Sequence, residues 1–455
     1  MNIIADLHIH SRFARACSKN TTIKNLAENS LIKGVGLLGT GDAQHPKWFE
    51  ELTTELKDEH HTGIYTAHGQ NFMCTTEISL AYSQGGKGRR VHHVVLLPNL
   101  HAVKGLQEAL LKRGRIDYDG RPIFGMTSPD FVELVRGVDE RCEIIPAHVW
   151  TPYFGLFGSK SGFDIIKDCF QDTMKHIHAI ETGISSDPSM NWRLKQLDNL
   201  QILSFSDSHS HWPWRIGREA TEFDLKEITY DSALNAIRTG NGLTRTIEFF
   251  PEEGRYHFDG HKNCGVIFSP QQSAQHNKLC PKCKRPLTIG VLNRVEELAT
   301  RPEGDLPPRP KPHVKLMPLS ELIAAGLGCP VASKKTWEVY NKLIAQFGNE
   351  YNASLNCTKE TLRDIVPTIS ALMLQNKQQK LEFLPGYDGE YGHLLVNGKP
   401  VGMKKQVVEK EKDDVTKEST PPQTMPFSKK KKPEPIAKDA QDLSSQQRQL
   451  GIEDF

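Results

Sequence analysis

The chain has 455 residues, of which 37% are hydrophobic and 25% charged, and its formal net charge is +2. This size fits about two or three globular domains, while the sequence has no apolar run long enough to span a bilayer and no signal-peptide pattern at its start. Nine cysteines with a single tight pair favour a reducing compartment over a disulfide framework. We therefore expect a cytoplasmic protein.

The chain opens with a predicted strand that ends in metal-binding side chains. Residues 2–5 are mostly apolar, and Asp6, His8 and His10 follow at alternate positions. Alternate residues of an extended chain point to one face, so we expect these three side chains to converge where the strand ends.

From residue 1 to about 225, short apolar runs alternate with segments of helical pattern. The runs that read as strands lie at residues 35–40, 93–97, 143–146, 179–181 and 201–205. This alternation predicts an α/β domain over residues 1–225, built on a largely parallel sheet or barrel.

Three further regions follow this domain. Residues 226–305 are predicted to hold a small zinc-binding module. Residues 306–403 read as a mostly helical C-terminal domain, with helices near 318–327, 334–347 and 359–375. Residues 404–455 are rich in Lys, Glu, Asp, Pro, Ser and Gln, which is typical of a disordered tail.

Potential metal ligands follow the predicted strands of the first domain, where α/β barrels place their active sites. After His8 and His10 they are Asp42, His45, Glu77, His92 or His93, His148, Asp207 and His209. Imidazoles with carboxylates suit Zn²⁺, Mn²⁺ or Fe²⁺, and Glu77 can bridge two ions.

A single such residue is more commonly a capping or surface residue, so it is the repetition at successive strand ends that favours a metal site. Of the neighbours His92 and His93, the one adjacent to the apolar run, His93, is favoured. Glu181 also ends a predicted strand, and we expect it to support a ligand rather than to bind the metal itself.

The segments "DLHIH", "TGD", "PAH" and "DSH", with the isolated Glu77 and a His before a hydrophobic run, resemble the PHP (polymerase and histidinol phosphatase) domain. The resemblance implies a distorted seven-stranded β/α barrel that cleaves phosphoesters with two or three divalent ions such as Zn, Mn or Mg. The implied catalytic residues are His8, His10, Glu77, Asp207 and His209.

The same resemblance implies the ligand sets. His8, His10, Glu77 and Asp207 would hold one ion, Glu77 with His93 and His148 a second, and Asp42 with His209 a third. Many PHP domains carry another His or Asp shortly after the opening pair, whereas this chain reads "SRFARACSK" there. The third site is therefore either weaker or completed by His45.

The segment "GHKNCGVIFSP…HNKLCPKCKRPLTIG" contains Cys264, Cys280 and Cys283. A C-x-x-C pair in a reducing compartment indicates structural zinc, which takes four ligands. His261, three residues before Cys264, is the favoured fourth ligand, and His257 and His276 are the alternatives. The alternative to a zinc site is that the three cysteines are simply buried thiols.

The zinc-binding segment, its continuation "PLTIGVLNRVEELATRP" and the later "LEFLPGYDGEYG" resemble the endonuclease Q family, over roughly residues 1 to 400. These are DNA-repair enzymes of archaea and some bacteria. The resemblance implies nicking of DNA on the 5′ side of uracil, hypoxanthine, xanthine or an abasic site, leaving a 3′-hydroxyl and a 5′-phosphate. The alternatives are a small-molecule phosphoesterase of the histidinol-phosphatase kind and a non-catalytic DNA-binding scaffold. We expect a monomer.

Enzymes that act on one base usually flip it into a pocket and stack it on aromatic or apolar groups. Candidate substrate-binding residues follow His148 and Asp207; they are Trp150, Phe154, Phe157, Lys160, Trp212, Trp214 and Arg215. Packing at the barrel mouth is the alternative role for these rings. The basic stretches at 87–90 and 282–285 are either solvated loops or contacts to nucleic acid.

The last residues read "QLGIEDF". Gln449, Ile452 and Phe455 resemble the peptide by which repair proteins bind the sliding clamp (PCNA), although such peptides usually carry two aromatic residues. A disordered tether ahead of the peptide would let it reach that partner.

Overall fold

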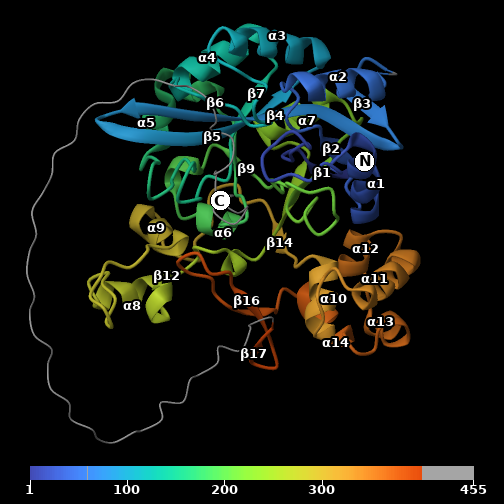
Figure 1. Ribbon diagram of the computed structural model, residues 1–455, viewed down its shortest axis with the longest axis vertical. Coiled ribbons are helices and arrows are strands. Elements are labelled where there is room, and N and C mark those ends of the chain that lie inside the picture. The colour runs from blue at the N-terminus through green and yellow to red at the C-terminus, as the bar shows by residue number, and fades with distance from the viewer. Residues whose placement is uncertain (59, 402–455) are drawn as a thin grey trace, which may run out of the picture. The chain divides into compact units, whose positions relative to one another are not determined.

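Ten strands form the main sheet of the computed structural model, which describes residues 1–58 and 60–401 (Figure 1). They are β1 (Asn2–Asp6), β2 (Leu37–Gly39), β3 (Ile64–Ala67), β4 (Gln70–Gln84), β5 (Lys87–Leu97), β6 (Ile123–Phe124), β7 (Glu143–Pro146), β10 (Ala220–Asp224), β11 (Leu243–Glu248) and β14 (His313–Lys315). A separate parallel pair is formed by β8 (Ala179–Glu181) and β9 (Gln201–Leu203).

The sheet follows one path of eight strands, in the order β14-β11-β10-β1-β2-β4-β5-β7, with β3 and β6 paired to β4 alone. Two contacts join β8 and β9 to this sheet, one next to β7, which ends the path, and one next to β1, which lies inside it. The N–H of Val149, after β7, donates to the carbonyl of Glu181, and Ile9, after β1, forms a bridge with Ser208, after β9. The result is an α/β fold on a curled sheet, as expected. The expected largely parallel pairing is wrong, because β10 pairs antiparallel with β1 and β5 pairs antiparallel with both β4 and β7.

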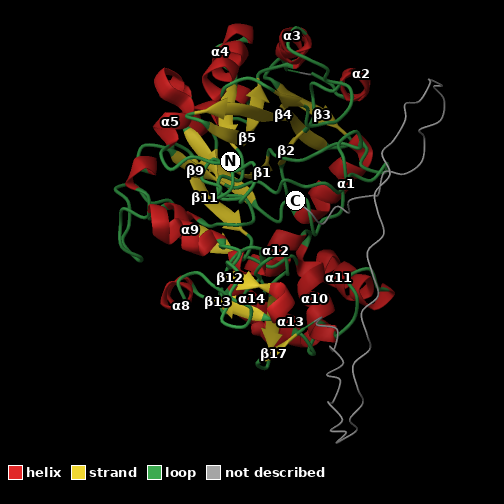
Figure 2. Ribbon diagram, turned by 60° about the vertical axis from the view of Figure 1, so that its left-hand side comes forward, coloured by secondary structure: helices red, strands yellow, loops and turns green. Residues whose placement is uncertain are grey.

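Helices of the first region are α1 (Ile23–Lys33), α2 (Pro46–Glu55), α3 (Leu100–Leu111), α4 (Ser128–Val138), α5 (Ile166–Phe170), α6 (Pro188–Asn191) and α7 (Tyr230–Thr239), with short 3-10 turns at η1 (Gln171–His176) and η2 (Lys195–Leu197). In Figure 2, α3 and α4 lie outside the curved sheet. Capping residues mark the ends of these helices. Thr127 caps α4 by accepting from the N–H of Asp130, and Gly34 ends α1 with a φ of 98°.

Alternation along the strands divides the core into two clusters. Val94 and Leu96 of β5 belong to a cluster with Ile3 and Ala5 of β1 and with the buried face of α7, whereas Val95 and Leu97 belong to the cluster with α1 to α4. Both faces of β5 are therefore apolar, as in sheets that are covered on both sides.

The main sheet extends past the expected domain boundary at residue 225. Two of its strands, β11 and β14, lie after this boundary in the chain. The zinc-binding segment contains β12 (Asp259–His261), β13 (Val266–Phe268), α8 (Pro270–Gln275), α9 (Val291–Leu298), η3 (Pro251–Glu253) and η4 (Lys262–Cys264).

The C-terminal region gathers α10 (Leu319–Leu327), α11 (Lys334–Phe347), α12 (Glu350–Leu355), α13 (Lys359–Ile365) and α14 (Ser370–Lys377) into one group (Figure 1), followed by β15 (Glu382–Leu384), β16 (His393–Val396) and β17 (Lys399–Pro400). The single helix expected at 359–375 is wrong. It is two helices, because Pro367 cannot continue a helix and disfavours helical backbone at the residue before it. No helix in the described part of the chain is long and apolar enough to cross a membrane.

Candidate metal centre

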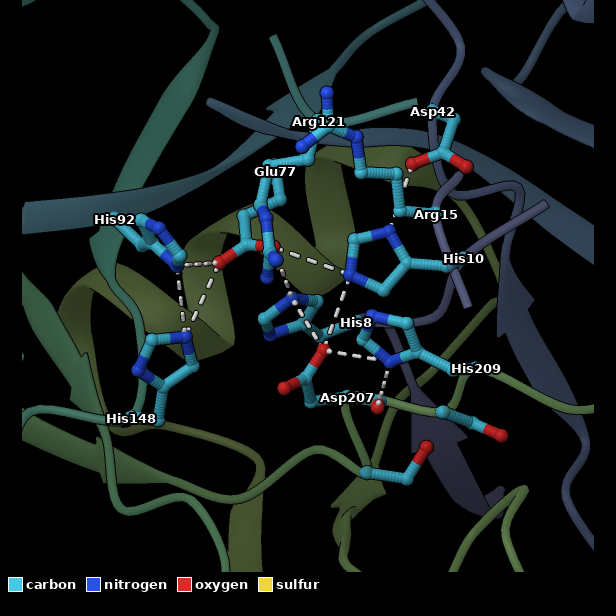
Figure 3. Close-up of polar contacts among 12 residues, drawn as sticks. His8, His10, Arg15, Asp42, Glu77, His92, Arg121, His148, Asp207 and His209 are labelled. Atoms are coloured by element: carbon cyan, nitrogen blue, oxygen red, sulfur yellow. Dashed lines mark hydrogen bonds and ion pairs between the residues drawn. The ribbon is translucent and has the colours of Figure 1, made fainter. Parts of the chain in front are cut away.

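Four side chains from distant parts of the sequence meet inside the curl of the sheet. Atoms of His8, His10, Glu77 and Asp207 that can bind a metal all lie within 4.8 Å of one another (Figure 3). The Nε2 of His10 is 3.0 Å from a carboxylate oxygen of Asp207 and 3.1 Å from Oε2 of Glu77. We call these four residues the first group.

A second group shares Glu77. Its other oxygen, Oε1, lies 2.7 Å from Nδ1 of His92 and 3.1 Å from Nε2 of His148. Glu77 thus presents one oxygen to each group, which is the arrangement of a carboxylate that bridges two metal ions. Glu77 does not end a strand as expected. It lies inside β4, which continues past the centre in a long hairpin with β5.

The histidines are oriented by hydrogen bonds on their outer side. Nδ1 of His8 lies 2.9 Å from a carboxylate oxygen of Glu181, and Nδ1 of His10 lies 2.9 Å from Oδ1 of Asp42. Nε2 of His8 is buried and has no hydrogen-bond partner among residues 1–58 and 60–401. A buried imidazole nitrogen that faces carboxylates and is held from behind by another carboxylate fits a metal ligand.

The electrostatics of the cluster fit a cation. Burial opposes ionisation of Glu77, but Arg121 and His92 outweigh it and hold the pKa of this carboxyl well below its usual range. Burial likewise opposes protonation of His8, yet Glu181 and Glu77 raise the pKa of His8 well above its ordinary value. The carboxylates therefore favour positive charge between them, which a divalent ion bound to neutral imidazoles supplies.

The preference for His93 over His92 is wrong. Adjacent strand residues point to opposite faces, and β5 turns His92 towards Glu77 while His93 points the other way. Nε2 of His93 lies 3.2 Å from the hydroxyl of Ser128, and its ring stacks on Phe131. His93 is a buried residue on the face of β5 that packs against α1 to α4.

The residues expected to bind a third ion are not brought together as a ligand group within the described residues. Both oxygens of Asp42 are engaged, Oδ1 by His10 and Oδ2 by the N–H of Ser11. His209 packs its ring on His10, with 4.2 Å between the ring centroids, and directs Nδ1 at the backbone carbonyl of Asp207. His45 stacks on Phe13 instead, and its Nε2 faces the backbone of residue 117.

Two further departures concern charged residues. Asp6 does not join the ligands, because its oxygens accept from the N–H groups of Ser206 and Gly217. Arg121, which was not among the predicted site residues, places Nη1 3.1 Å from Oε2 of Glu77 (Figure 3). It lies in a loop just before β6 rather than at a strand end, so strand-end reasoning could not find it.

The candidate substrate-binding rings differ in exposure. Trp150 and Phe157 are 1% and 0% exposed and pack on each other, so they belong to the core and cannot stack on a base as the sequence suggested. Trp212 is 43% exposed and stacks on Trp214 at 5.0 Å between centroids. Phe154 packs on His92 beside the second group, at 4.5 Å between the ring centroids.

The two candidate cations also lie at the surface. Arg215, half-buried, comes within 3.9 Å of Glu321, and Lys160 is exposed on the loop after Phe157. Gln449, Ile452 and Phe455 lie outside the described residues.

The zinc candidates form a separate cluster. Ligand atoms of His261, Cys264, Cys280 and Cys283 lie within 4.8 Å of one another. Burial opposes ionisation of Cys280, but the N–H groups of Cys283 and Lys282 outweigh it and lower the pKa of this thiol to about 6. Four N and S donors that lie together, one of them a thiol whose low pKa favours the thiolate, fit a zinc site closed by four protein ligands. His257 and His276 lie outside this cluster.

No protein-family model matches the chain. The sequence is 28% identical to the uncharacterized protein YqxK of Bacillus subtilis over 416 residues, which covers 86% of this chain and 99% of YqxK. It is 29% identical to the uncharacterized protein MJ0043 of Methanocaldococcus jannaschii over 325 residues, or 69% of this chain, but the match spans only 38% of MJ0043.

Two solved structures match most of the chain. The crystal structure of the lesion-specific endonuclease PfuEndoQ from Pyrococcus furiosus is 30% identical, with a TM-score of 0.78 over 87% of this chain and 95% of that one. The crystal structure of an endonuclease Q in complex with a 27-mer duplex substrate carrying an abasic lesion has the same identity and TM-score, over 90% of this chain and 100% of that one. With this identity over nearly the full length of both structures, the chain belongs to the endonuclease Q family.

Proposed function

We propose that this protein is a metal-dependent DNA-repair endonuclease. It hydrolyses the phosphodiester on the 5′ side of a deaminated base (uracil, hypoxanthine or xanthine) or an abasic site, and leaves a 3′-hydroxyl and a 5′-phosphate. The observation that carries the proposal is the pair of ligand groups joined by Glu77 in a chain of the endonuclease Q family. The neighbouring endonuclease Q structure holds a duplex with an abasic lesion at its active site, which supports the same substrate class here.

Each residue of the centre has a role in this proposal. His8, His10, Glu77 and Asp207 would hold one ion, and Glu77 with His92 and His148 a second. Divalent ions in such a site supply hydroxide at neutral pH and neutralise charge on the phosphate.

Arg121 and His209 complete the centre from two sides. Arg121 adds a fixed positive charge beside Glu77 that can contact a phosphate oxygen. The ring of His209 packs on the ring of His10. We propose that this position lets His209 contact the substrate beside the first group. We propose two ions, Zn, Mn or Mg. The barrel strands would be β1, β2, β4, β5, β7, β8 and β9, seven in all.

Recognition of the lesion is assigned to the loop that follows Asp207. Trp212 offers an exposed ring whose other face is supported by Trp214, and Trp337 of α11 packs against both at 5.9 and 5.4 Å. A flipped base stacks on such a supported ring. The C-terminal helices would thus help to build the lesion site.

The rival functions explain less of the chain. A small-molecule phosphoesterase needs neither the clustered Cys and His of the zinc candidate nor a tryptophan platform, and a DNA-binding scaffold needs no complete ligand groups. The structural zinc would stabilise the module that contains it.

We also propose that Gln449, Ile452 and Phe455 bind the sliding clamp. Clamp loaded on a nicked circle should raise the nicking rate at low enzyme concentration, since tethering raises the local concentration of enzyme. Phe455→Ala should lose most of this gain while keeping its rate without clamp. Equal stimulation of both proteins would overturn the clamp proposal.

The function is tested with labelled duplexes that carry uracil, hypoxanthine, an abasic site or only normal bases, incubated with and without chelator. We expect nicking of the damaged strands alone, lost with chelator and restored by added Mn²⁺ or Mg²⁺. Hydrolysis of histidinol phosphate without DNA nicking would favour the small-molecule rival, and lesion binding without any nicking would favour the scaffold.

A further inference from the structure

We propose that the outer half of the β4–β5 hairpin binds the sugar-phosphate backbone of the DNA strand beside the cleaved phosphate, with Arg90 as its principal contact. This inference rests on the proposed function in one respect, that the chain binds DNA at the metal centre. The hairpin extends beyond residues 93–96 of β5, which pair with β7, and continues to Gln84 and Lys87. In Figure 1 its two long strands run side by side to the edge of the molecule.

The register of the hairpin places Arg90 on the face of the metal centre. Glu77 lies opposite Val94, Ser79 opposite His92, Ala81 opposite Arg90, and Ser83 opposite Gly88. Alternation puts all of these on one face. Arg90 is thus the first side chain outward from His92 on that face, about 7 Å along the strand, or about two nucleotides of duplex rise.

The face has room for a strand of DNA to approach. The cross-strand neighbours of Arg90 and Gly88 are the small residues Ala81 and Ser83. A Cβ at Gly88 would meet no atom within 4 Å, and its φ lies outside the left-handed region, so the fold itself does not require glycine there. Glycine at such a position allows close approach by a partner backbone.

Both the side chain and the backbone of Arg90 contact the loop that contains Phe154 and Ser161. Its guanidinium lies 5.7 Å from the ring centroid of Phe154, and that ring packs on His92. The N–H groups of Arg90 and His92 donate to the carbonyls of Ser161 and Phe154, which fixes the loop along the edge of β5. Phe154 has a φ of 61°, a rare conformation for a bulky residue, and strain of this kind is found at binding sites.

The charge of this surface suits a polyanion. Residues 81–90 and 154–163 contain Lys87, Arg89, Arg90 and Lys160 and no acidic residue. Arg90 forms no ion pair with a carboxylate within the described residues, and the next acidic residue of the loop, Asp164, is paired with Arg294. A held and unpaired arginine next to the centre of cleavage is suited to a backbone phosphate.

The test compares Arg90→Ala with Lys87→Ala, a matched control. Lys87 is a cation of the same hairpin whose position alternation assigns to the opposite face. Binding of the full chain to an undamaged and an abasic duplex is measured in chelator, over a range of salt concentrations, so that no cleavage occurs. A thermal melt confirms that each variant is folded.

We expect Arg90→Ala to reduce the slope of log K against log salt by about 1, equally for both duplexes, because one phosphate contact is lost. Arg90→Lys should keep the slope, and Lys87→Ala should change it by less than half as much. An unchanged slope in a folded Arg90→Ala variant, or an equal change in Lys87→Ala, would overturn the proposal. This measurement reports binding and does not involve nicking. The Arg90 proposal can therefore fail while the endonuclease proposal stands, and the endonuclease proposal can fail while the Arg90 proposal stands.

Discussion

Glu181 accepts hydrogen bonds from the side chain of one candidate ligand and the backbone of another. One of its oxygens lies 2.9 Å from Nδ1 of His8, and the other accepts from the N–H of His148 at 2.7 Å. His8 belongs to the first group and His148 to the second, so a single buried carboxylate positions ligands of both.

This position predicts the effect of Glu181→Gln. The amide removes the charge that supports the His8 imidazole, and one of its two acceptor atoms becomes a donor. Loss of such a supporting group usually weakens metal binding about 10- to 100-fold. Calorimetric titration of the metal-free protein with Mn²⁺ should show this loss, and nicking should recover at higher Mn²⁺.

Glu143→Gln is the matched control. Glu143 is also buried and paired with a histidine, His178, at 2.8 Å, but neither residue belongs to a ligand group. Its Mn²⁺ affinity should equal that of the wild type. If Glu181→Gln bound Mn²⁺ as tightly as Glu143→Gln, Glu181 would have no role in positioning the ligands.

The zinc cluster predicts a loss of metal on mutation. Cys280→Ser with Cys283→Ser should release one zinc per chain and expose the surrounding segment to proteolysis, since metal binding and folding are linked in such modules. Cys329→Ser, a half-buried cysteine outside the cluster, should retain the zinc. Equal zinc content in all three proteins, measured by elemental analysis, would show that the cluster is not a metal site.

A buried carboxyl away from the ligand groups predicts a pH dependence of stability. Burial raises the pKa of Glu248 from its ordinary 4.5 to about 8, even though the hydroxyls of Thr182 and Ser204 donate to one of its oxygens. The folded state therefore holds a proton that the unfolded state releases above pH 4.5. Stability should fall as the pH rises through this window, with the full loss present above about pH 8.

Glu248→Gln removes the Glu248 carboxyl from this titration and keeps an acceptor for the two hydroxyls, while the buried Glu219, whose pKa is raised by burial and by Glu248, is present in both proteins. Relative to the wild type, its free energy of unfolding should rise by roughly 2–5 kcal/mol between pH 5 and pH 9, at about 1.4 kcal/mol for each unit of pKa shift. Urea unfolding at a series of pH values measures this difference. Parallel curves for the two proteins would mean that Glu248 is ionised in the folded state.

An ion pair joins the C-terminal helices to the sheet domain. Nζ of Lys33 lies 2.6 Å from Glu350, with 3% and 2% of the side chains exposed, and Tyr340 and the N–H of Leu319 also donate to Glu350. Lys33→Met leaves a buried carboxylate without its cation, which typically costs about 3–5 kcal/mol of stability. The double variant Lys33→Met/Glu350→Gln should recover most of that loss, because the amide is neutral and still accepts a hydrogen bond.

The exposed pair of Lys334 and Glu338 serves as the reference for this test. Lys334→Met should change the free energy of unfolding by less than about 0.5 kcal/mol. A loss of the same size in Lys33→Met would show that the buried pair is dispensable.

Spacing along the sequence predicted the parts of the centre that depend on local pattern. His8, His10, Glu77 and Asp207 were selected because they accompany apolar segments, and the resemblance to the PHP domain implied that they share one ion. Their ligand atoms do lie together. The choice between His92 and His93 failed because both faces of β5 are covered by apolar residues, so the sequence shows no alternation to read.

Other features depend on tertiary contacts that no local pattern encodes. Arg121 reaches Glu77 from a loop that carries no ligand, and Asp42 lies outside the ligand groups, with its oxygens bonded to His10 and Ser11. Trp150 and Phe157 could not be told from exposed rings, because a glycine-rich loop gives no periodicity from which burial is inferred.

Mapping the ends of the DNA at a single nick shows whether the metal groups hydrolyse the phosphodiester. A 5′-labelled duplex with one abasic site is cut, and the labelled product is sized and offered to a DNA polymerase. We predict a product that ends on the 5′ side of the lesion with a 3′-hydroxyl that the polymerase extends, and no product with Glu77→Gln, Asp207→Asn or chelator. A product cut on the 3′ side, blocked to extension and formed in the presence of chelator, would show elimination chemistry and would exclude hydrolysis by the metal groups.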